Sequence, residues 1–281
     1  MQTFKELQAL RTCIAEWRDK KERIAFVPTM GNLHAGHFSL IALARQHADK
    51  VVASVFVNPT QFGPNEDFDR YPRTPVDDAR GLVEAGCDAL WMPDVAQMYP
   101  FGVEATVKVS VPGVTEVLDG AHRPGHFDGV ATVVSRLFNQ VQPHTAVFGR
   151  KDYQQLAVIR YLVSDLAFPI EIVGAPTARA PDGLALSSRN QYLDEAQRAL
   201  APALYESLQA VARSVASGGD IDAAEQEGLR QLRALGFDPD YLVVRTPALT
   251  APESHDTRLV ALVAARLGKT RLIDNLEFDR T

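Results

Sequence analysis

The segment Ile24–His37 has the sequence IAFVPTMGNLHAGH, and it decides the predicted fold. Its apolar first part, Ile24–Val27, predicts a buried strand that ends at Pro28. Gly31 and Gly36 allow a tight turn after the strand and a close approach of backbone to a ligand. The segment therefore predicts a strand, a short turn and the start of a helix.

The flanking regions continue an alternation of helices and strands. Five upstream apolar residues recur at helical spacing and predict a helix before the strand: Phe4, Leu7, Leu10, Ile14 and Trp17. Downstream, Phe38–Ala48 predicts a second helix. The run Val51–Val57 (VVASVFV) is typical of a strand buried on both faces of a parallel sheet.

The same alternation continues to about Pro176. We expect helices at Pro75–Ala85, along the face Val130, Val133, Val134, Leu137, Phe138 and Val141, and from Asp152 to about Ala167. We expect strands at Asp88–Met92, Ala146–Phe148 and Ile170–Val173, with an edge strand at Val107–Val111. This order predicts an α/β fold with a doubly wound, Rossmann-like parallel sheet over residues 1–176. Ligands of such sheets gather beyond the carboxyl ends of the strands.

After residue 176 the pattern changes to that of a second, smaller α+β domain over residues 177–281. Two amphipathic helices are expected, at about Asp194–Ser217 and Asp220–Leu235. Short strands are expected at Tyr241–Val244, Leu259–Val263 and Arg271–Ile273.

Composition and charge narrow the classes of partner. The 281 residues carry a formal net charge of -6, so the chain lacks the global basic field that drives binding to nucleic acid. The two cysteines, Cys13 and Cys87, exclude a disulfide framework and fit a reducing compartment. Charges run throughout the first 21 residues, which argues against a signal peptide or a membrane span. We expect a cytoplasmic protein without nucleic-acid or membrane partners.

His34 and His37 are the first candidates for chemistry. They are three residues apart at a helix start, so their rings are neighbours, and the helix N-terminus favours anions such as phosphates. Imidazoles there can donate hydrogen bonds to phosphate oxygens. Ordinary surface histidines or a metal pair are the alternatives, although zinc pairs on helices more often have the spacing H-x-x-x-H.

The motif Pro28-Thr29-Met30-Gly31 followed by His34-Ala35-Gly36-His37 resembles the ATP-binding signature of class I adenylate-forming nucleotidyltransferases. In its extended form it resembles the pantothenate synthetase (pantoate–β-alanine ligase) family. Five further stretches resemble the same family in the expected order, so that the resemblance runs from about residue 24 to about 195: Phe56–Phe62, Tyr71–Thr74, Arg123–Phe127, Phe148–Leu156 and Asp182–Asn190. The resemblance implies an ATP-dependent ligase, homodimeric in this family, that condenses (R)-pantoate with β-alanine through a pantoyl-adenylate.

The resemblance also implies which residues bind ATP. His37 and His34 would lie over the phosphates, and Lys151 would neutralise charge as pyrophosphate leaves, so these three are the catalytic candidates. The full expected ATP-binding set is Met30, Gly31, Asn32, Leu33, His34, Ala35, Gly36, His37, Gly149, Arg150, Lys151, Asp152, Ala178, Leu186, Ser187, Ser188 and Arg189. Taken alone, Asp152 fits a helix N-cap as well as a ribose contact, and Ser187-Ser188-Arg189 fits a solvated turn.

The resemblance also implies binding sites for pantoate, β-alanine and Mg²⁺. Gln61 would bind pantoate and later β-alanine, and Gln155 would bind pantoate; Gln61 alone could equally be a polar loop residue. Asp77 and Asp78 would assist Mg²⁺, but adjacent carboxylates at a helix start also suit the helix dipole. The resemblance implies that residues 1–176 hold the nucleotide and pantoate, and that the smaller domain acts as a lid.

Two positions depart from the family pattern. Arg150 stands where Glu is common, and Asp119 stands where Glu is expected near Arg123. Two other functions share part of the motif set: a nucleotidyltransferase acting on a phosphorylated alcohol, and a nucleotide-sensing or RNA-binding relative of aminoacyl-tRNA synthetases. The first would not need Gln61 and Gln155, and the second predicts a basic face that this acidic chain lacks.

Overall fold

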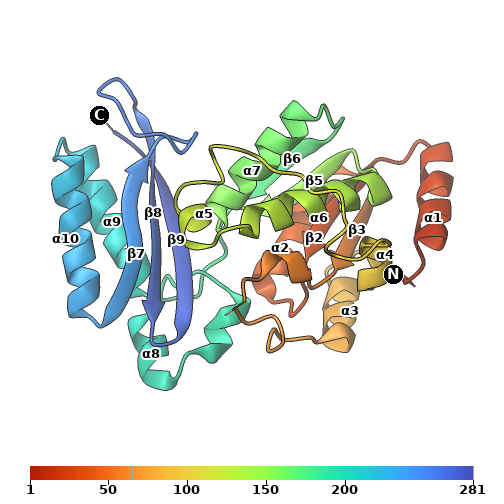
Figure 1. Ribbon diagram of the computed structural model, residues 1–281, viewed down its shortest axis with the longest axis horizontal. Coiled ribbons are helices and arrows are strands. Elements are labelled where there is room, and N and C mark those ends of the chain that lie inside the picture. Colours follow the sequence, from red (N-terminus) through yellow and green to blue (C-terminus); the bar gives the residue numbers. More distant parts are fainter. Residues whose placement is uncertain (65, 281) are drawn as a thin grey trace. The chain divides into compact units, whose positions relative to one another are not determined.

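The computed structural model describes residues 1–64 and 66–280, which form two compact units (Figure 1). Unit 1 comprises Met1–Arg150 and Gln154–Pro176. Unit 2 comprises Lys151–Tyr153 and the chain from Thr177 onward.

The described part of unit 1 is built on a six-stranded sheet in the order β1-β4-β3-β2-β5-β6. The strands are β1 (Gln2–Phe4), β2 (Ile24–Thr29), β3 (Lys50–Val55), β4 (Ala89–Trp91), β5 (Thr145–Gly149) and β6 (Glu171–Ala175). All neighbouring pairs are parallel. The strand order reverses between β2 and β5, so the predicted doubly wound α/β sheet is confirmed, and its switch point lies where these two strands end.

Both faces of this sheet are buried. Ile24 and Phe26 of β2 belong to one apolar cluster, whereas Ala25 and Val27 belong to another, as the alternation of side chains along a strand requires. The first cluster includes residues of α1 (Leu7–Asp19), α6 (His126–Val141) and α7 (Tyr153–Asp165). The second includes residues of α2 (Ala35–His47) and α3 (Pro75–Glu84). Continuous apolar runs such as Val51–Val57 follow from this two-sided burial.

The N-terminal residues differ from the sequence-based prediction. The expected helix from Phe4 begins instead at Leu7, because Gln2–Phe4 pairs with β4 as a parallel edge strand. This strand has only three residues, two of them polar and exposed, so it carries no periodic signal.

The expected edge strand at Val107–Val111 is wrong. All five residues are described, and they form no strand. The Val109 amide donates to Thr132 Oγ1 of α6 at 2.9 Å, while the Val111 side chain is buried in the apolar cluster beside α6. The segment thus packs on a helix and not at an edge of the sheet; β1 and β6 are the edge strands.

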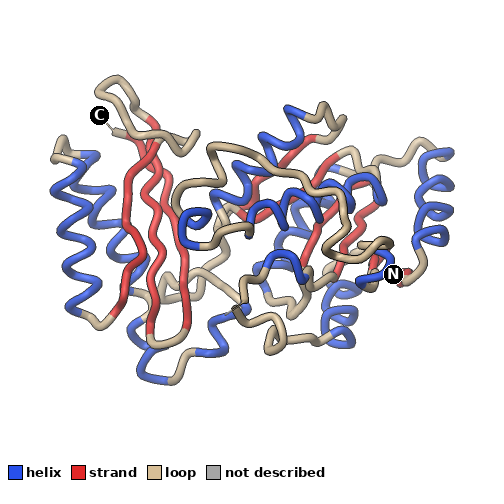
Figure 2. The backbone as a smooth tube through the Cα atoms, viewed as in Figure 1, coloured by secondary structure: helices blue, strands red, loops and turns tan. Residues whose placement is uncertain are grey.

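Unit 2 is an α+β unit, as predicted. Its strands β7 (Phe237–Arg245), β8 (Arg258–Leu267) and β9 (Thr270–Asp279) form an antiparallel sheet in that order. The helices α9 (Ala203–Ala216) and α10 (Ile221–Ala234) pack against each other and against these strands (Figure 2). The predicted helix from Asp194 to Ser217 is interrupted, with α8 (Glu195–Leu200) ending before α9, because Pro202 has no amide to continue the bonding.

Short helices complete the chain: η1 (Pro59–Gln61), α4 (Val95–Met98), α5 (Asp119–His122) and η2 (Ser188–Tyr192). Cys13 and Cys87 are buried free thiols, and burial raises the pKa of Cys87 to about 11. Of the helices within residues 1–64 and 66–280, none has both the length and the apolarity needed to span a bilayer.

Candidate active site

Left-handed backbone shapes the turn that follows β2. Gly31 has φ +82° and Asn32 has φ +51°. Thr29 Oγ1 donates to the Ser54 carbonyl at 2.7 Å and accepts from the Gly31 amide at 3.2 Å, which ties the turn to β3. A Cβ at position 31 would lie 3.0 Å from Asp78 Oδ2, so both the backbone angle and the space require glycine there.

Asp78, in the first turn of α3, fixes the rest of this turn. Its carboxylate is 2% exposed, and its two oxygens accept from the amides of Asn32 (3.0 Å) and Leu33 (2.7 Å). Thr74 Oγ1 donates a third hydrogen bond, at 3.0 Å, to the same group. The buried carboxylate therefore holds the two residues that precede His34.

The two histidines cap the start of α2. His34 is the N-cap, and its Nδ1 accepts from the Gly36 amide at 3.1 Å. His37 Nδ1 accepts from the His34 amide at 3.3 Å, and the ring centroids are 4.2 Å apart. A nitrogen that accepts an N–H carries no proton, so each neutral ring has its proton on Nε2. The backbone thereby selects the tautomer that makes Nε2 a donor.

This arrangement suits an anion. The rings lie in the first turn of α2, where the helix dipole is positive, and they follow β2 at the switch point of the sheet. Two Nε2–H donors held by backbone hydrogen bonds can bind phosphate oxygens without reorganising.

Gln61 ends η1, beyond the carboxyl end of β3, and is 8% exposed. Its Oε1 accepts from Asn58 Nδ2 at 2.9 Å, and Asn58 Nδ2 also donates to the Gly129 carbonyl of α6 at 3.2 Å. Tyr99 Oη donates to Asn58 Oδ1 at 2.6 Å. Gln61 is therefore part of a buried amide network and not a solvated loop residue.

A second network holds the Gln61 main chain. His126 Nδ1 donates to the Gln61 carbonyl at 2.8 Å, and His126 Nε2 accepts from Arg123 Nη1 at 3.0 Å. Arg123 also donates two bonds of 2.7 Å to the Glu66 carboxylate. Burial, helped by the Arg123 charge, lowers the pKa of His126 to about 4. Burial alone would raise the pKa of Glu66, but its bonds with Arg123 give a lowered value.

The two glutamines that open α7 have different surroundings. Gln155, the predicted pantoate ligand, is half-buried. Gln154 is 4% exposed; its Oε1 accepts from the Asp119 amide, and its Nε2 donates to the carbonyls of Val114 and Val117. Gln154 thus fastens the 114–119 turn to α7.

The carboxyl end of β5 leads into the predicted Gly149–Asp152 segment. Arg150 Nε donates to the Gly174 carbonyl of β6 at 3.0 Å, and the Arg150 amide donates to the Ala175 carbonyl at 2.8 Å. The arginine that departs from the family pattern therefore binds the neighbouring strand.

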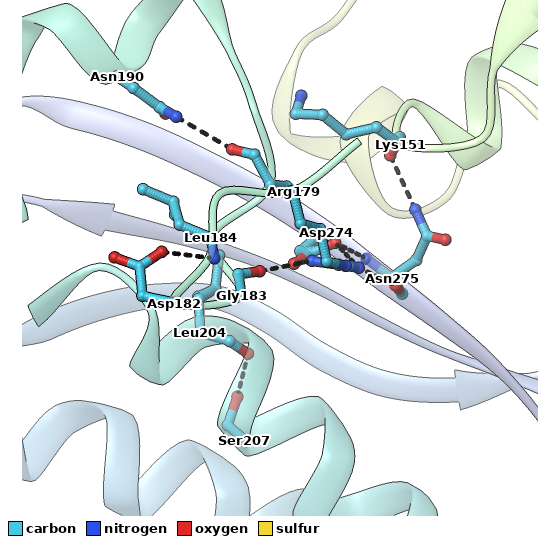
Figure 3. A network of polar contacts seen from close by, with 11 residues as sticks. Lys151, Arg179, Asp182, Gly183, Leu184, Asn190, Leu204, Ser207, Asp274 and Asn275 are labelled. Atoms are coloured by element: carbon cyan, nitrogen blue, oxygen red, sulfur yellow. Dashed lines mark hydrogen bonds and ion pairs between the residues drawn. The ribbon is translucent and has the colours of Figure 1, made fainter. Parts of the chain in front are cut away.

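Lys151 and Asp152 belong to unit 2. Lys151 Nζ lies 3.8 Å from Asp152 Oδ1, and the lysine side chain is 18% exposed. The Lys151 carbonyl accepts from Asn275 Nδ2 of β9 at 2.8 Å, and Figure 3 shows the lysine ammonium directed away from this contact.

The predicted ATP residues after position 177 lie on a short hairpin and the loop that follows it. The Leu186 amide donates to the Ala178 carbonyl at 2.9 Å, and Arg179 pairs with Ala185 in an isolated antiparallel β-bridge. Ser187 then caps η2, with its Oγ accepting from the Arg189 amide at 3.3 Å. Ser187, Ser188 and Arg189 are all half-buried.

The family profile described as pantoate–β-alanine ligase matches residues 2–277 of this chain. The chain belongs to the pantoate–β-alanine ligase family. Pantothenate synthetases of Stenotrophomonas maltophilia strain K279a and Xanthomonas axonopodis pv. citri strain 306 are 61% and 59% identical to it, each over 99% of this chain and 100% of the relative.

Solved structures of the pantoate–β-alanine ligase family share the fold. The pantothenate synthetase of Thermus thermophilus matches with TM-score 0.92 and 48% identity, covering 98% of this chain and 99% of its own. The Francisella tularensis ligase, complexed with beta-gamma ATP and β-alanine, matches with TM-score 0.83 and 33% identity, covering 98% and 97%. This chain is accordingly an enzyme, a pantoate–β-alanine ligase that forms pantothenate.

The two acidic residues predicted to assist Mg²⁺ in this ligase have separate surroundings. Both Asp78 oxygens accept backbone hydrogen bonds, whereas the exposed Asp77 pairs with Arg80. Across the described residues, no group of three or more His, Cys, Asp or Glu side chains could hold a metal ion.

Several residues that organise the ligase site do not stand out in the sequence. In the sequence, Asp78 is recognisable only as a candidate Mg²⁺ ligand or as a partner of the helix dipole. Gln154 and His126 occur there only as members of longer motifs. Asn275 gives no signal, because its partner lies 124 positions away. Side chains that act on distant backbone have no local pattern to reveal them.

Proposed function

We propose that this ligase works in two steps. The carboxylate of pantoate attacks the α-phosphorus of ATP, which forms pantoyl-adenylate and releases pyrophosphate. The amine of β-alanine then attacks the acyl carbon and expels AMP, giving pantothenate. The observation that carries this proposal is the pair of imidazoles that cap α2, each with Nδ1 accepting a backbone amide.

His34 and His37 act as phosphate donors in the first step. Charge develops on the phosphate oxygens as pyrophosphate departs, and preorganised Nε2–H groups stabilise this charge more than they stabilise bound ATP. The left-handed Gly31 and Asn32 shape the segment from Met30 to Gly36, which is proposed to lie beside the same phosphates at the N-terminus of α2.

Unit 2 supplies the cationic donors. Lys151 is a compact charge that can follow the leaving pyrophosphate, and Arg189 offers a planar fork of donors. Ser187 and Ser188 add hydroxyl donors. The remaining proposed ATP contacts are Gly149, Arg150, Asp152, Ala178 and Leu186.

Pantoate and β-alanine are proposed to bind through amides. Gln61 and Gln155 bind pantoate, and Gln61 later binds β-alanine, because an amide can both donate to a carboxylate and accept from a hydroxyl or amine. The fixed main chain of Gln61 supports this role. The complex of the Francisella relative with beta-gamma ATP and β-alanine supports these two compounds as substrates here.

Three broader features are part of the proposal. Mg²⁺, when bound with ATP, neutralises phosphate charge, with Asp77 and Asp78 as the protein groups proposed to assist. Residues 177–281 act as a lid over the nucleotide bound by residues 1–176. The ligase works as a cytoplasmic homodimer.

The test is AMP release from ATP, which must depend on both pantoate and β-alanine. His37→Ala should lower pantoate-dependent exchange of labelled pyrophosphate into ATP by about 10²–10³-fold, as loss of a transition-state donor does. His47→Ala, at the other end of α2, is the matched control and should leave exchange unchanged. Normal exchange in His37→Ala would refute the proposed role of this histidine.

A further inference from the structure

The Lys151 segment is fastened to β9 at two points. Asn275 Nδ2 donates to the Lys151 carbonyl at 2.8 Å, and Tyr153 Oη donates to Glu277 Oε1 at 3.1 Å. Asn275 and Glu277 are two positions apart on one strand, so they share a face. These bonds explain why Lys151–Tyr153 belongs to unit 2, although the chain on both sides of it belongs to unit 1.

The same point of β9 also holds the hairpin that leads into the Ser187–Arg189 loop. Arg179 binds Asp274 with two hydrogen bonds, of 2.6 and 2.9 Å, and donates to the Asn275 carbonyl at 3.2 Å (Figure 3). It also donates to the Gly183 carbonyl at 3.0 Å, across the hairpin turn. Its guanidinium lies 3.6 Å from the centre of the Tyr205 ring. The bidentate and stacked geometry fixes Arg179 more firmly than a single bond could.

The two β9 residues are rigid themselves. Asp274 and Asn275 are 4% and 6% exposed, and the Asn275 amide donates to Asp274 Oδ1 at 2.8 Å. One buried dipeptide therefore contacts both segments: the asparagine amide holds the lysine segment, and the aspartate carboxylate holds the hairpin.

We propose that Asp274 and Asn275, here called the β9 anchor, are positioning residues that hold Lys151 and the Ser187–Arg189 loop in a fixed spatial relation within unit 2. This inference rests on the proposed function, which makes both segments ligands of the triphosphate. The anchor acts through these two segments: it sets the position of the Lys151 main chain and the point at which the loop begins. A misplacement of about 1 Å in such a group can cost up to about 100-fold in rate.

The test removes the link to Lys151 without changing the lysine. Asn275→Leu keeps similar volume but has no donor for the Lys151 carbonyl. It should slow pantoate-dependent pyrophosphate exchange by about tenfold. Formation of pantothenate from supplied pantoyl-adenylate and β-alanine should stay unchanged, because no pyrophosphate leaves in that step. Tyr153→Phe, which removes only the second link, should produce a smaller loss in the same step and serves if Asn275→Leu does not fold.

The matched control is Asp240→Asn. Asp240 accepts from Arg271 Nε at 2.7 Å, so this variant removes the negative charge of a half-buried ion pair on the same sheet without changing either segment. It should lower stability and leave pyrophosphate exchange unchanged.

A double-variant cycle separates positioning from general damage. If Asn275 acts through Lys151, then Asn275→Leu should slow exchange no further in a Lys151→Ala background. If the losses of exchange rate in the two single variants multiply in the double variant, the anchor is overturned. A normal exchange rate in both Asn275→Leu and Tyr153→Phe would also overturn it, and either outcome would leave the proposed function intact. Normal exchange in Lys151→Ala would overturn the lysine role itself, and the anchor with it.

Discussion

Asp78 decides the backbone geometry on which the two histidines depend. Its oxygens accept from the Asn32 and Leu33 amides, while Gly31 and Asn32 hold positive φ angles, which glycine and asparagine adopt more readily than other residues. A buried carboxylate that accepts several N–H bonds can hold such a turn without help from a ligand. The same residue is a predicted Mg²⁺ ligand, and the two roles make different predictions.

Asp78→Ala should slow adenylation at every Mg²⁺ concentration, because two buried amides lose their acceptor and the turn before His34 relaxes. The free energy of unfolding should fall by about 1–3 kcal/mol. The measurement is pyrophosphate exchange over a Mg²⁺ titration, with Glu84→Ala as control, since Glu84 is an exposed carboxylate at the other end of the same helix, α3. Recovery of the Asp78 variant at high Mg²⁺ would favour the metal role.

His126 should make the stability of the protein depend on pH. Its pKa is about 4 in the folded chain, against an ordinary value of 6.5, because burial and Arg123 oppose the charged ring. The hydrogen bond to the Gln61 carbonyl and the charges of Glu66 and Asp119 only partly offset them. As the pH falls, His126 takes up a proton in the unfolded chain before it does so in the folded chain. The contribution of His126 to stability is therefore present above about pH 6.5 and is lost as the pH falls toward about 4. Between about pH 7 and about pH 5 the loss is on the order of 2 kcal/mol.

Urea unfolding at the two pH values measures this effect. His126→Asn removes the titrating group and should show a smaller loss of stability over the same range. An equal pH dependence in both proteins would show that other groups cause it.

For single residues, the sequence reveals local chemistry but misses the distant residues that support it. His34 and His37 stand three positions apart, so spacing alone pairs them. Asp78 lies 46 positions from Asn32, and His126 lies 65 from Gln61, so only the folded chain brings them together.

Among the elements, α6 and η1 meet through a position that tolerates no side chain. A Cβ on Gly129 would lie 2.3 Å from the Thr60 carbonyl oxygen and 3.0 Å from the Gln61 amide nitrogen. Backbone meets backbone here, so neither partner can rotate away. The glycine sets the distance of α6 from the short helix that carries Gln61.

Gly129→Ala should therefore displace η1. We expect a loss of stability of about 1–3 kcal/mol from overpacking and a raised KM for pantoate, with the KM for ATP nearly unchanged. Gly63→Ala is the control, because its added Cβ would meet nothing closer than 3.8 Å. Steady-state kinetics with each substrate varied in turn would check this, and unchanged pantoate kinetics in a folded Gly129→Ala would argue against the role of Gln61.

Most helices and strands could be predicted because their faces are buried and periodic. The failures have physical causes. The strand β1 is too short for a period. Residues 107–111 alternate like a strand, although Val109 and Val111 pack in the apolar cluster beside α6 and Val107 is exposed. The break between α8 and α9 follows from Pro202, whose missing amide outweighs the helical periodicity on either side of it.

For the whole molecule, each compact unit has a core of its own. Unit 1 buries apolar clusters on both faces of its parallel sheet, and unit 2 buries one between its helices and its antiparallel sheet. The proposed roles follow the same division, with imidazoles on unit 1 and the lysine, serines and arginine on unit 2. The sequence predicts two domains but assigns Lys151 to the first, because its neighbours in sequence give no sign of the contacts with β9.

Separate cores predict that the two units can lose structure in separate steps. Both tryptophans, Trp17 and Trp91, belong to unit 1, so tryptophan fluorescence follows that unit alone, whereas far-UV circular dichroism follows both. Leu208→Ala, in the unit 2 core, should cost about 2–5 kcal/mol in that unit and lower the urea midpoint seen by circular dichroism, leaving the fluorescence midpoint unchanged. Leu162→Ala, in the unit 1 core, should shift the fluorescence midpoint. If both probes instead move together in each variant, the chain unfolds as one cooperative body and the two units are not independent domains.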